Sequence, residues 1–199
     1  MVVQDGQAAA PGNFAGYYAQ DHANSNLTWC VGYLNPLVPA TPDNTNIALL
    51  MLSQLGPYAK AHDIYKCPGD KNKLVRSYAM NCYLGEVPGV APYTRGFTHF
   101  YKANALAGMS TSNAFVFLDE RTDSINDGCF FVDMYSGDAE MMDGPGFYHS
   151  KKGAVFSFAD GHAEAKFWRD ARMMPKTFTG YIPYCEDLVW LRERSTVPQ

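Results

Sequence analysis

A short segment, residues 154–167, constrains the fold of this chain more than any other. Large and small residues alternate on both sides of Asp160-Gly161, in the stretch AVFSFADGHAEAKF. An Asp-Gly pair between two alternating stretches is among the strongest short signals for a β-hairpin, because both positions of a two-residue turn need positive φ. The segment therefore predicts two antiparallel strands joined at Asp160-Gly161.

The register of this hairpin follows if these two residues alone form the turn. The predicted cross-strand pairs then place each ring opposite a small residue: Ala159–His162, Phe158–Ala163, Phe156–Ala165 and Ala154–Phe167. We expect this face of both strands to be buried. The other face, with Val155, Ser157, Glu164 and Lys166, should be half-solvated, as in an antiparallel sheet that is covered on one side.

Composition and charge narrow the class of protein. With 199 residues, of which 47% are hydrophobic, the chain can bury one real core, and a single domain over residues 1–199 is expected. A net charge of -4 without a lysine or arginine cluster argues against nucleic-acid binding, which needs a concentrated basic surface. No apolar run approaches the roughly 20 residues of a membrane span, so we expect neither a membrane segment nor a signal peptide in this chain.

Other periodic stretches predict an α+β fold in which helix packs on an antiparallel β-sheet with long loops. Residues 46–55 are apolar nearly all round and predict a helix that Pro57 ends or kinks. The further expected strands are 64–68, 77–84, 114–118 and 129–134, and a short helix or strand is expected at 186–194. The loop at 135–148 is rich in glycine and acidic residues.

Several motifs together carry a family resemblance. His149 is followed, after ten intervening residues, by Asp160-Gly161, and the upstream matches are YAQD (18–21), LGPY (55–58), IYKCPGD (64–70) and SYAMN (77–81). In this order they resemble the prepilin-type, pseudopilin-like proteins with a C-terminal H-X9-DG domain, although that pattern usually has nine intervening residues. The resemblance spans most of residues 14–168.

The resemblance implies a pilin-like fold and a structural or assembly role, in the periplasm or at the cell surface. The partners would be other pseudopilin-like subunits or secretion machinery. Such proteins begin with a cleavable leader and a long apolar helix, neither of which we expect in this chain. We therefore expect a truncated N-terminal helix, no fixed structure over residues 1–13, and a protein-specific C-terminal extension at 169–199.

An acidic loop after the strand at 114–118 predicts a metal site. The candidate ligands are Asp119, Glu120, Asp123, Asn126 and Asp127, to which Asp160 in the hairpin turn is added. Closely spaced oxygen ligands suit calcium, which takes six to eight of them. The resemblance adds weight, because many type II secretion pseudopilins hold calcium in a loop beside their C-terminal strands. The alternative is a solvated acidic turn.

His149 and His162 offer a second candidate group. We expect His149 to stand over the hairpin close to Asp160 and His162, either as a transition-metal site or as a hydrogen-bonded brace. These histidines would be the general bases if the chain is instead a calcium-dependent hydrolase of a small ester or lactone, with the ion as Lewis acid. No common serine-esterase or zincin motif is present, and a glycosidase is less favoured. A glycan-binding surface formed by the aromatics of 93–101 is a weaker alternative.

The five cysteines are Cys30, Cys67, Cys82, Cys129 and Cys185. They contain no C-x-x-C pair, so a zinc ribbon is not indicated, and the odd number leaves at least one thiol free. Cys67 and Cys82 flank a short loop and would pair first if the protein is extracytoplasmic. The alternative is that all five are small buried apolar residues.

Overall fold

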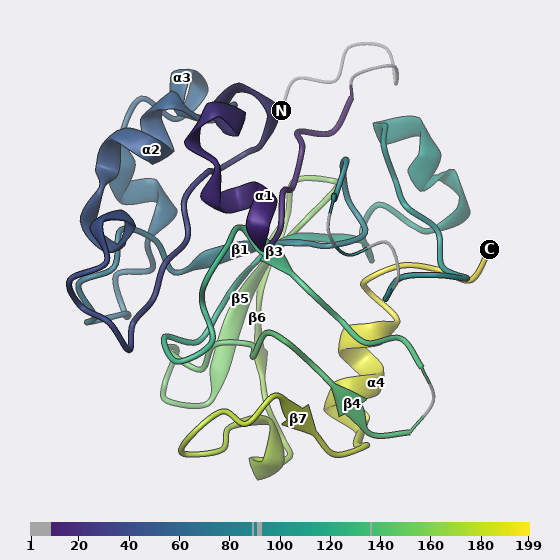
Figure 1. The fold of residues 1–199 in the computed structure, drawn as a ribbon. Helices are drawn as coiled ribbons and strands as arrows, with labels where there is room; N and C mark the ends of the chain where they lie inside the picture. The colour runs from purple at the N-terminus through teal and green to yellow at the C-terminus, as the bar shows by residue number, and fades with distance from the viewer. Residues whose placement is uncertain (1–8, 89, 91–92, 136) are drawn as a thin grey trace.

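The computed structural model describes residues 9–88, 90, 93–135 and 137–199 (Figure 1). Its centre is a five-stranded sheet in the order β3-β1-β2-β5-β6. These strands are β1 (Tyr78–Asn81), β2 (Phe115–Asp119), β3 (Cys129–Phe130), β5 (Gly153–Phe158) and β6 (Ala163–Phe167). Neighbours are antiparallel except β1 and β3, which are parallel, so the fold is mixed α/β with a mixed sheet. The expectation of a purely antiparallel sheet is wrong at the β3 edge, because the chain passes from β2 across to the far side of β1.

The remaining elements are short. The helices are α1 (Tyr17–Gln20), α2 (Ile47–Leu52), α3 (Gly56–Ala59) and α4 (Glu186–Arg192), and β4 (Ala139–Glu140) pairs with β7 (Tyr181–Ile182) in a separate two-stranded sheet. Single 3-10 turns cover His22–Leu27, Pro42–Thr45, His62–Tyr65, Ala103–Gly108 and Ala171–Met173. None of the helices in the described ranges has the length and apolar character that a bilayer crossing requires.

The predicted strands at 77–84 and 114–118 are confirmed as β1 and β2, and the segment at 186–194, for which helix and strand were both left open, forms the helix α4. The predicted helix at 46–55 divides into α2 and α3, and Pro57 lies in the first turn of α3, where its missing N–H leaves no hydrogen bond unmade. The strand predicted at 64–68 is wrong, since residues 62–65 form a 3-10 turn. Of the strand predicted at 129–134, only the first two residues pair with β1.

Both faces of the sheet are covered by apolar side chains. On one face Phe156 contacts Phe115 and, from α4, Trp190, with ring centroids 5.4 and 5.1 Å apart. On the other face Phe117 contacts Trp29 at 4.9 Å. In Figure 1, α2 and α3 lie on the opposite side of the sheet from α4. The last thirty residues therefore contribute to the main core rather than only to an edge.

The predicted hairpin forms, but its register differs by one residue. The N–H of Phe158 donates to the carbonyl of His162 at 2.9 Å, so Ala159, Asp160 and Gly161 all belong to the turn. Gly161 has φ +96°, the left-handed position of a three-residue hairpin loop. The observed pairs are Ser157–Ala163, Phe156–Glu164, Val155–Ala165, Ala154–Lys166 and Gly153–Phe167.

A one-residue shift exchanges the two faces of a strand, and this has happened to β6. The buried face predicted for β5 is confirmed at Ala154, Phe156 and Phe158. In β6, however, Ala163, Ala165 and Phe167 are exposed instead of buried. Lys166 turns inward, where its ammonium lies 2.6 Å from Asp187 and 5.0 Å from the Trp190 ring centroid.

The start of the described chain is held in place. The Asn13 side-chain amide is buried and donates to the carbonyls of Met80 and Asn81, both at 3.0 Å. The N–H of Ala10 donates to the carbonyl of Tyr101. Residues 9–13, for which we expected no fixed structure, are thus tied to the sheet region, whereas residues 1–8 lie outside the described part.

Candidate functional site

Three side chains from distant parts of the sequence meet at one end of the β5–β6 hairpin. Cys67 lies in the turn that follows the His62–Tyr65 segment, Asp119 ends β2, and His149 opens the tight turn that leads into β5. Two left-handed residues, Ser150 and Lys151, turn the chain tightly so that His149 bonds back to Gly153. Among the residues described, this is the one group of three potential metal ligands whose ligand atoms all lie within 4.8 Å of one another. We call it the hairpin-foot centre.

The distances show how the three groups are arranged. His149 Nε2 lies 3.0 Å from Asp119 Oδ2 and 3.4 Å from Cys67 Sγ. In a catalytic relay the acid and the nucleophile bind opposite ring nitrogens of the histidine. Here both face the same nitrogen, so the geometry is that of three groups converging on one point and not that of a Cys-His-Asp relay.

Asp119 is the most deeply buried member of the centre, with its side chain 0% exposed. Its Oδ2 accepts the N–H of Val155 at 2.7 Å, while its Oδ1 has no hydrogen-bond partner among the described residues. Burial raises the pKa of Asp119, and the Val155 N–H and the His149 ring partly offset that rise. A buried carboxylate oxygen without a partner is uncommon and needs an explanation.

Cys67 is also buried, and the Cys-Pro-Gly-Asp turn positions its thiol. Burial raises the pKa of this thiol, as does the nearby Asp119 carboxylate, whereas the N–H groups of Gly69 and Asp70 act in the opposite direction. The hydroxyl of Tyr78 also lies against the sulfur. His149 is 34% exposed and is the solvent-accessible member of the centre.

The six predicted calcium ligands do not converge on one point. Asp119 belongs to the hairpin-foot centre, Asp123 pairs with Arg121, and Asp160 lies in the exposed hairpin turn. The backbone carbonyl of Asn126 accepts hydrogen bonds from the Arg76 guanidinium and from the N–H of Leu34. Glu120 and Asp127 turn into the interior and are buried.

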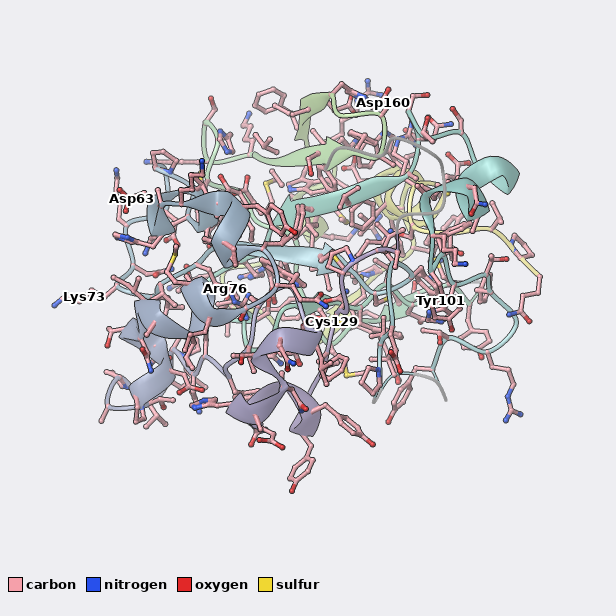
Figure 2. All side chains as sticks on the ribbon, turned by 90° about the horizontal axis from the view of Figure 1, so that it is seen from above. Asp63, Lys73, Arg76, Tyr101, Cys129 and Asp160 are labelled. Carbon is pink, nitrogen blue, oxygen red and sulfur yellow. The ribbon has the colours of Figure 1, made fainter. Side chains whose placement is uncertain are left out.

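Glu120 and Asp127 belong to a buried acidic group that also contains Asp143. Arg76 is the cation that faces all three, and it is itself buried; Figure 2 labels it away from the outline of the molecule. Burial raises the pKa of each carboxyl, and the charges of the other two add to this for Glu120. Glu120 Oε1 accepts from Ser124, but Oε2 has no partner in the described structure. Asp143 comes from the acid-rich 135–148 loop, where sequence alone gave no sign of which acid turns inward.

The expected grouping of His149 with Asp160 and His162 is wrong. β5 has six residues at about 3.3 Å each, so its two ends lie roughly 16 Å apart, with His149 at one end and the turn at the other. Asp160 and His162 bond to each other at 2.6 Å, and Figure 2 shows Asp160 at the outer edge of the molecule. The two histidines therefore cannot share one hydrolytic site.

Sequence reasoning missed Cys67 as a site residue and treated it as a disulfide candidate. All five cysteines, each within the described ranges, carry free thiols. Cys67 lies beside His149, while Cys82 lies beside Cys129, so the expected Cys67–Cys82 pairing does not occur. The available signal was the turn sequence CPGD, which directs two N–H groups at the preceding sulfur.

An apolar hollow of about 500 Å³ lies on the same face of the sheet as the hairpin-foot centre. Its lining residues are Trp29, Leu55, Tyr58, Ala59, Ile64, Tyr65, Tyr78, Phe117, Val155 and Ser157. Tyr78 belongs to both features, because its ring lines the hollow and its hydroxyl reaches Cys67. Of the 93–101 aromatics considered for glycan binding, Phe100 is buried in the core.

Comparisons with known proteins do not assign the chain to a family. No model of a protein family matches it, and no similar protein is found among curated sequences or solved structures.

Proposed function

We propose that this chain is a pseudopilin-like structural or assembly domain that works outside the cytoplasm, in the periplasm or at the cell surface. The observation that carries the proposal is a continuous apolar surface, which joins the hollow to the open edge of the sheet. Its expected partners are other pseudopilin-like subunits or secretion machinery. The motif resemblance of residues 14–168 supports the same role.

The apolar surface follows from the strand register. Phe117 pairs with Ser157, which pairs with Ala163, and Val155 pairs with Ala165, so these side chains share one face. Ala163, Ala165 and Phe167 continue this face onto β6 and are exposed, with Phe167 at 50%. The floor of the hollow and the sheet edge thus form one surface.

Within the described residues β6 is also an edge strand, with one neighbour in the sheet. The unpaired N–H and C=O groups of such a strand are ready to bind another strand, and assembly by strand addition uses this property. An apolar face beside a free edge gives a second copy of this chain both side-chain and main-chain contacts.

Sedimentation velocity over a range of protein concentrations tests this role. We expect reversible self-association of the wild-type chain that Ala165→Glu weakens strongly. Ala105→Glu, at an exposed alanine in the Ala103–Gly108 turn, is the matched control and should associate like the wild type. A wild-type chain that stays monomeric, or equal association of the two variants, contradicts the proposal.

As part of the same role, we propose calcium binding at the buried acidic group of Glu120, Asp127 and Asp143. Three buried carboxyls face one arginine, and Glu120 Oε2 lacks a partner in the described residues. Their oxygens do not all lie within 4.8 Å of one another, so calcium would draw them together to balance charge and supply the missing contact. At calcium a hundredfold above Kd, the free energy of unfolding should rise by about 2.7 kcal/mol. If the thermal melting curves with calcium and with a chelator coincide, the calcium proposal is contradicted.

A further inference from the structure

We propose that the hairpin-foot centre is a transition-metal site, in which Cys67 Sγ, Asp119 and His149 Nε2 hold one ion of the zinc class. Each residue supplies one ligand, and a water molecule completes a four-coordinate shell. This site is separate from the calcium proposal and does not depend on an assembly role.

The ligand separations fit such an ion. Bonds of about 2.0 to 2.3 Å in a tetrahedral shell place neighbouring ligand atoms roughly 3.3 to 3.7 Å apart. The nitrogen lies 3.0 Å from the carboxylate oxygen and 3.4 Å from the sulfur, and all three ligand atoms lie within 4.8 Å of one another. Adjustments of a few tenths of an ångström at the accessible His149 ring would complete the geometry.

The unpartnered oxygen of Asp119 is an independent observation. Oδ1 is fully buried without a hydrogen bond from any described residue, whereas Oδ2 already accepts the Val155 N–H. An unsatisfied buried acceptor costs about 1 to 3 kcal/mol, and more when it is charged. An ion bound by this carboxylate would offset the cost of leaving Oδ1 without a hydrogen-bond partner.

The turn around Cys67 places hydrogen-bond donors at its sulfur, and these donors would remain in contact with a metal-bound thiolate. Two backbone N–H groups, from Gly69 and Asp70, are directed at the sulfur, and Tyr78 adds a hydroxyl. A Gly69 Cβ would lie 3.4 Å from the sulfur, so the turn wraps it closely.

The donor set and its charge select the class of ion. Calcium and magnesium prefer shells made only of oxygens, whereas mixed sulfur, nitrogen and oxygen ligands suit zinc and its neighbours. A thiolate and a carboxylate carry two negative charges. A divalent ion neutralises both of them, which lowers the cost of burying these charges. The 34% exposure of His149 leaves a route for the ion from solvent.

Titration of chelator-treated protein with cobalt(II) and with zinc(II) tests the proposal. We expect one ion per chain and a near-ultraviolet thiolate-to-cobalt charge-transfer band that zinc abolishes by competition. Cys67→Ser should remove the band, and Cys67→Ser and His149→Ala should each weaken zinc binding by at least about 100-fold. The matched controls are Cys82→Ser, at a buried thiol elsewhere, and His162→Ala at the hairpin turn.

Circular dichroism of each metal-free variant first establishes that it is folded, and Asp119→Asn, which keeps an acceptor for the Val155 N–H, provides a further folded variant. The proposal is overturned if cobalt gives no thiolate band, if Cys67→Ser binds zinc like the wild type, or if calcium competes equally with zinc. Failure of self-association would affect the assembly role and leave this result unchanged.

Discussion

The β5–β6 hairpin carries a histidine–aspartate pair at each end, and the two pairs behave differently. At the hairpin foot His149 Nε2 lies 3.0 Å from Asp119, whose carboxylate is 0% exposed. At the hairpin tip His162 Nδ1 lies 2.6 Å from Asp160, whose carboxylate is 36% exposed. The residue types and distances are similar, so the differences between the pairs arise from solvent and from neighbours.

The pKa values of the two carboxyls shift in opposite directions. The backbone N–H and the ring of His162 lower the pKa of Asp160, with water free to solvate the rest of the group. Burial raises the pKa of Asp119 in spite of its contacts with Val155 and His149. The exposed pair in the turn finds its hydrogen-bond partners locally and in water. In the buried pair, one carboxylate oxygen of Asp119 lacks a hydrogen-bond partner among the described residues, which is a property expected of a binding site.

The largest contrast should appear when each carboxylate is removed. Asp119→Ala leaves the Val155 N–H without its acceptor in a buried place, so the free energy of unfolding of the metal-free protein should fall by about 3 kcal/mol. Asp160→Ala should leave the urea midpoint unchanged. Similar losses at both ends in urea unfolding would show that burial does not distinguish the pairs.

A second contrast concerns pH, and it depends on Glu120, next to Asp119. Burial and the charge of Asp143 raise the pKa of Glu120 well above its ordinary 4.5, with Asp127 and Arg76 also facing it. The folded metal-free protein therefore keeps a proton that the unfolded chain releases. The stabilisation by this proton is fully present below the pKa that Glu120 has in the unfolded chain. It is lost as pH rises through the pKa of Glu120 in the folded protein, and the free energy of unfolding then falls by up to about 1.4 kcal/mol per pH unit for each proton.

We expect urea unfolding from pH 5 to pH 8, in the presence of a chelator, to show this decline, and Glu120→Gln to flatten it. Asp160→Asn is the matched control and should keep the wild-type slope. A wild-type stability that rises over this range would reverse the sign and refute the burial argument.

The hairpin tip can be tested through its backbone. Gly161 has φ +96° and open space around the position of a Cβ, so Gly161→Ala should cost about 1 kcal/mol through backbone strain alone. Gly108 has equally open surroundings without a left-handed φ, and Gly108→Ala should be neutral or slightly stabilising. Equal midpoints for the two variants in chemical denaturation would argue against the three-residue turn.

The smallest expected effect tests the strand register. Ala165 faces solvent in the observed register and would face the core in the register predicted from sequence, so Ala165→Lys should change stability by less than about 0.5 kcal/mol in dilute, monomeric protein. Ala154→Lys on the neighbouring strand places a charge in the core and should prevent folding. A large loss for Ala165→Lys, measured by thermal melting, would favour the other register.

These particular elements show what sequence could and could not predict of the fold. Alternation predicted β5 and its buried face, and the apolar run at 114–118 predicted β2, because each pattern is local. The face of β6 was missed because one extra residue in the turn exchanges inside and outside, and turn length is not set by Asp-Gly alone. The parallel β1–β3 pairing depends on a long connection whose path no periodic pattern encodes.

The candidate site shows the same difference between what local sequence patterns encode and what long-range packing decides. His149 and Asp119 were identified from motif and charge, but they were assigned to different groups, because sequence spacing does not show which end of a strand a residue reaches. Cys67 was missed since its partners lie 52 and 82 positions away, at Asp119 and His149. Which acidic residues of the predicted loop face one another depends on their burial. Burial is a property of the packed chain, so the sequence alone did not show it.

Zinc K-edge absorption of the zinc-loaded protein tests the central claim most directly, because it reports the atoms bound to the ion. We expect one sulfur at about 2.3 Å with nitrogen and oxygen ligands at about 2.0 Å, and loss of the sulfur contribution in Cys67→Ser. A shell of oxygen and nitrogen alone in the wild-type protein, or a sulfur contribution that survives this substitution, would contradict it.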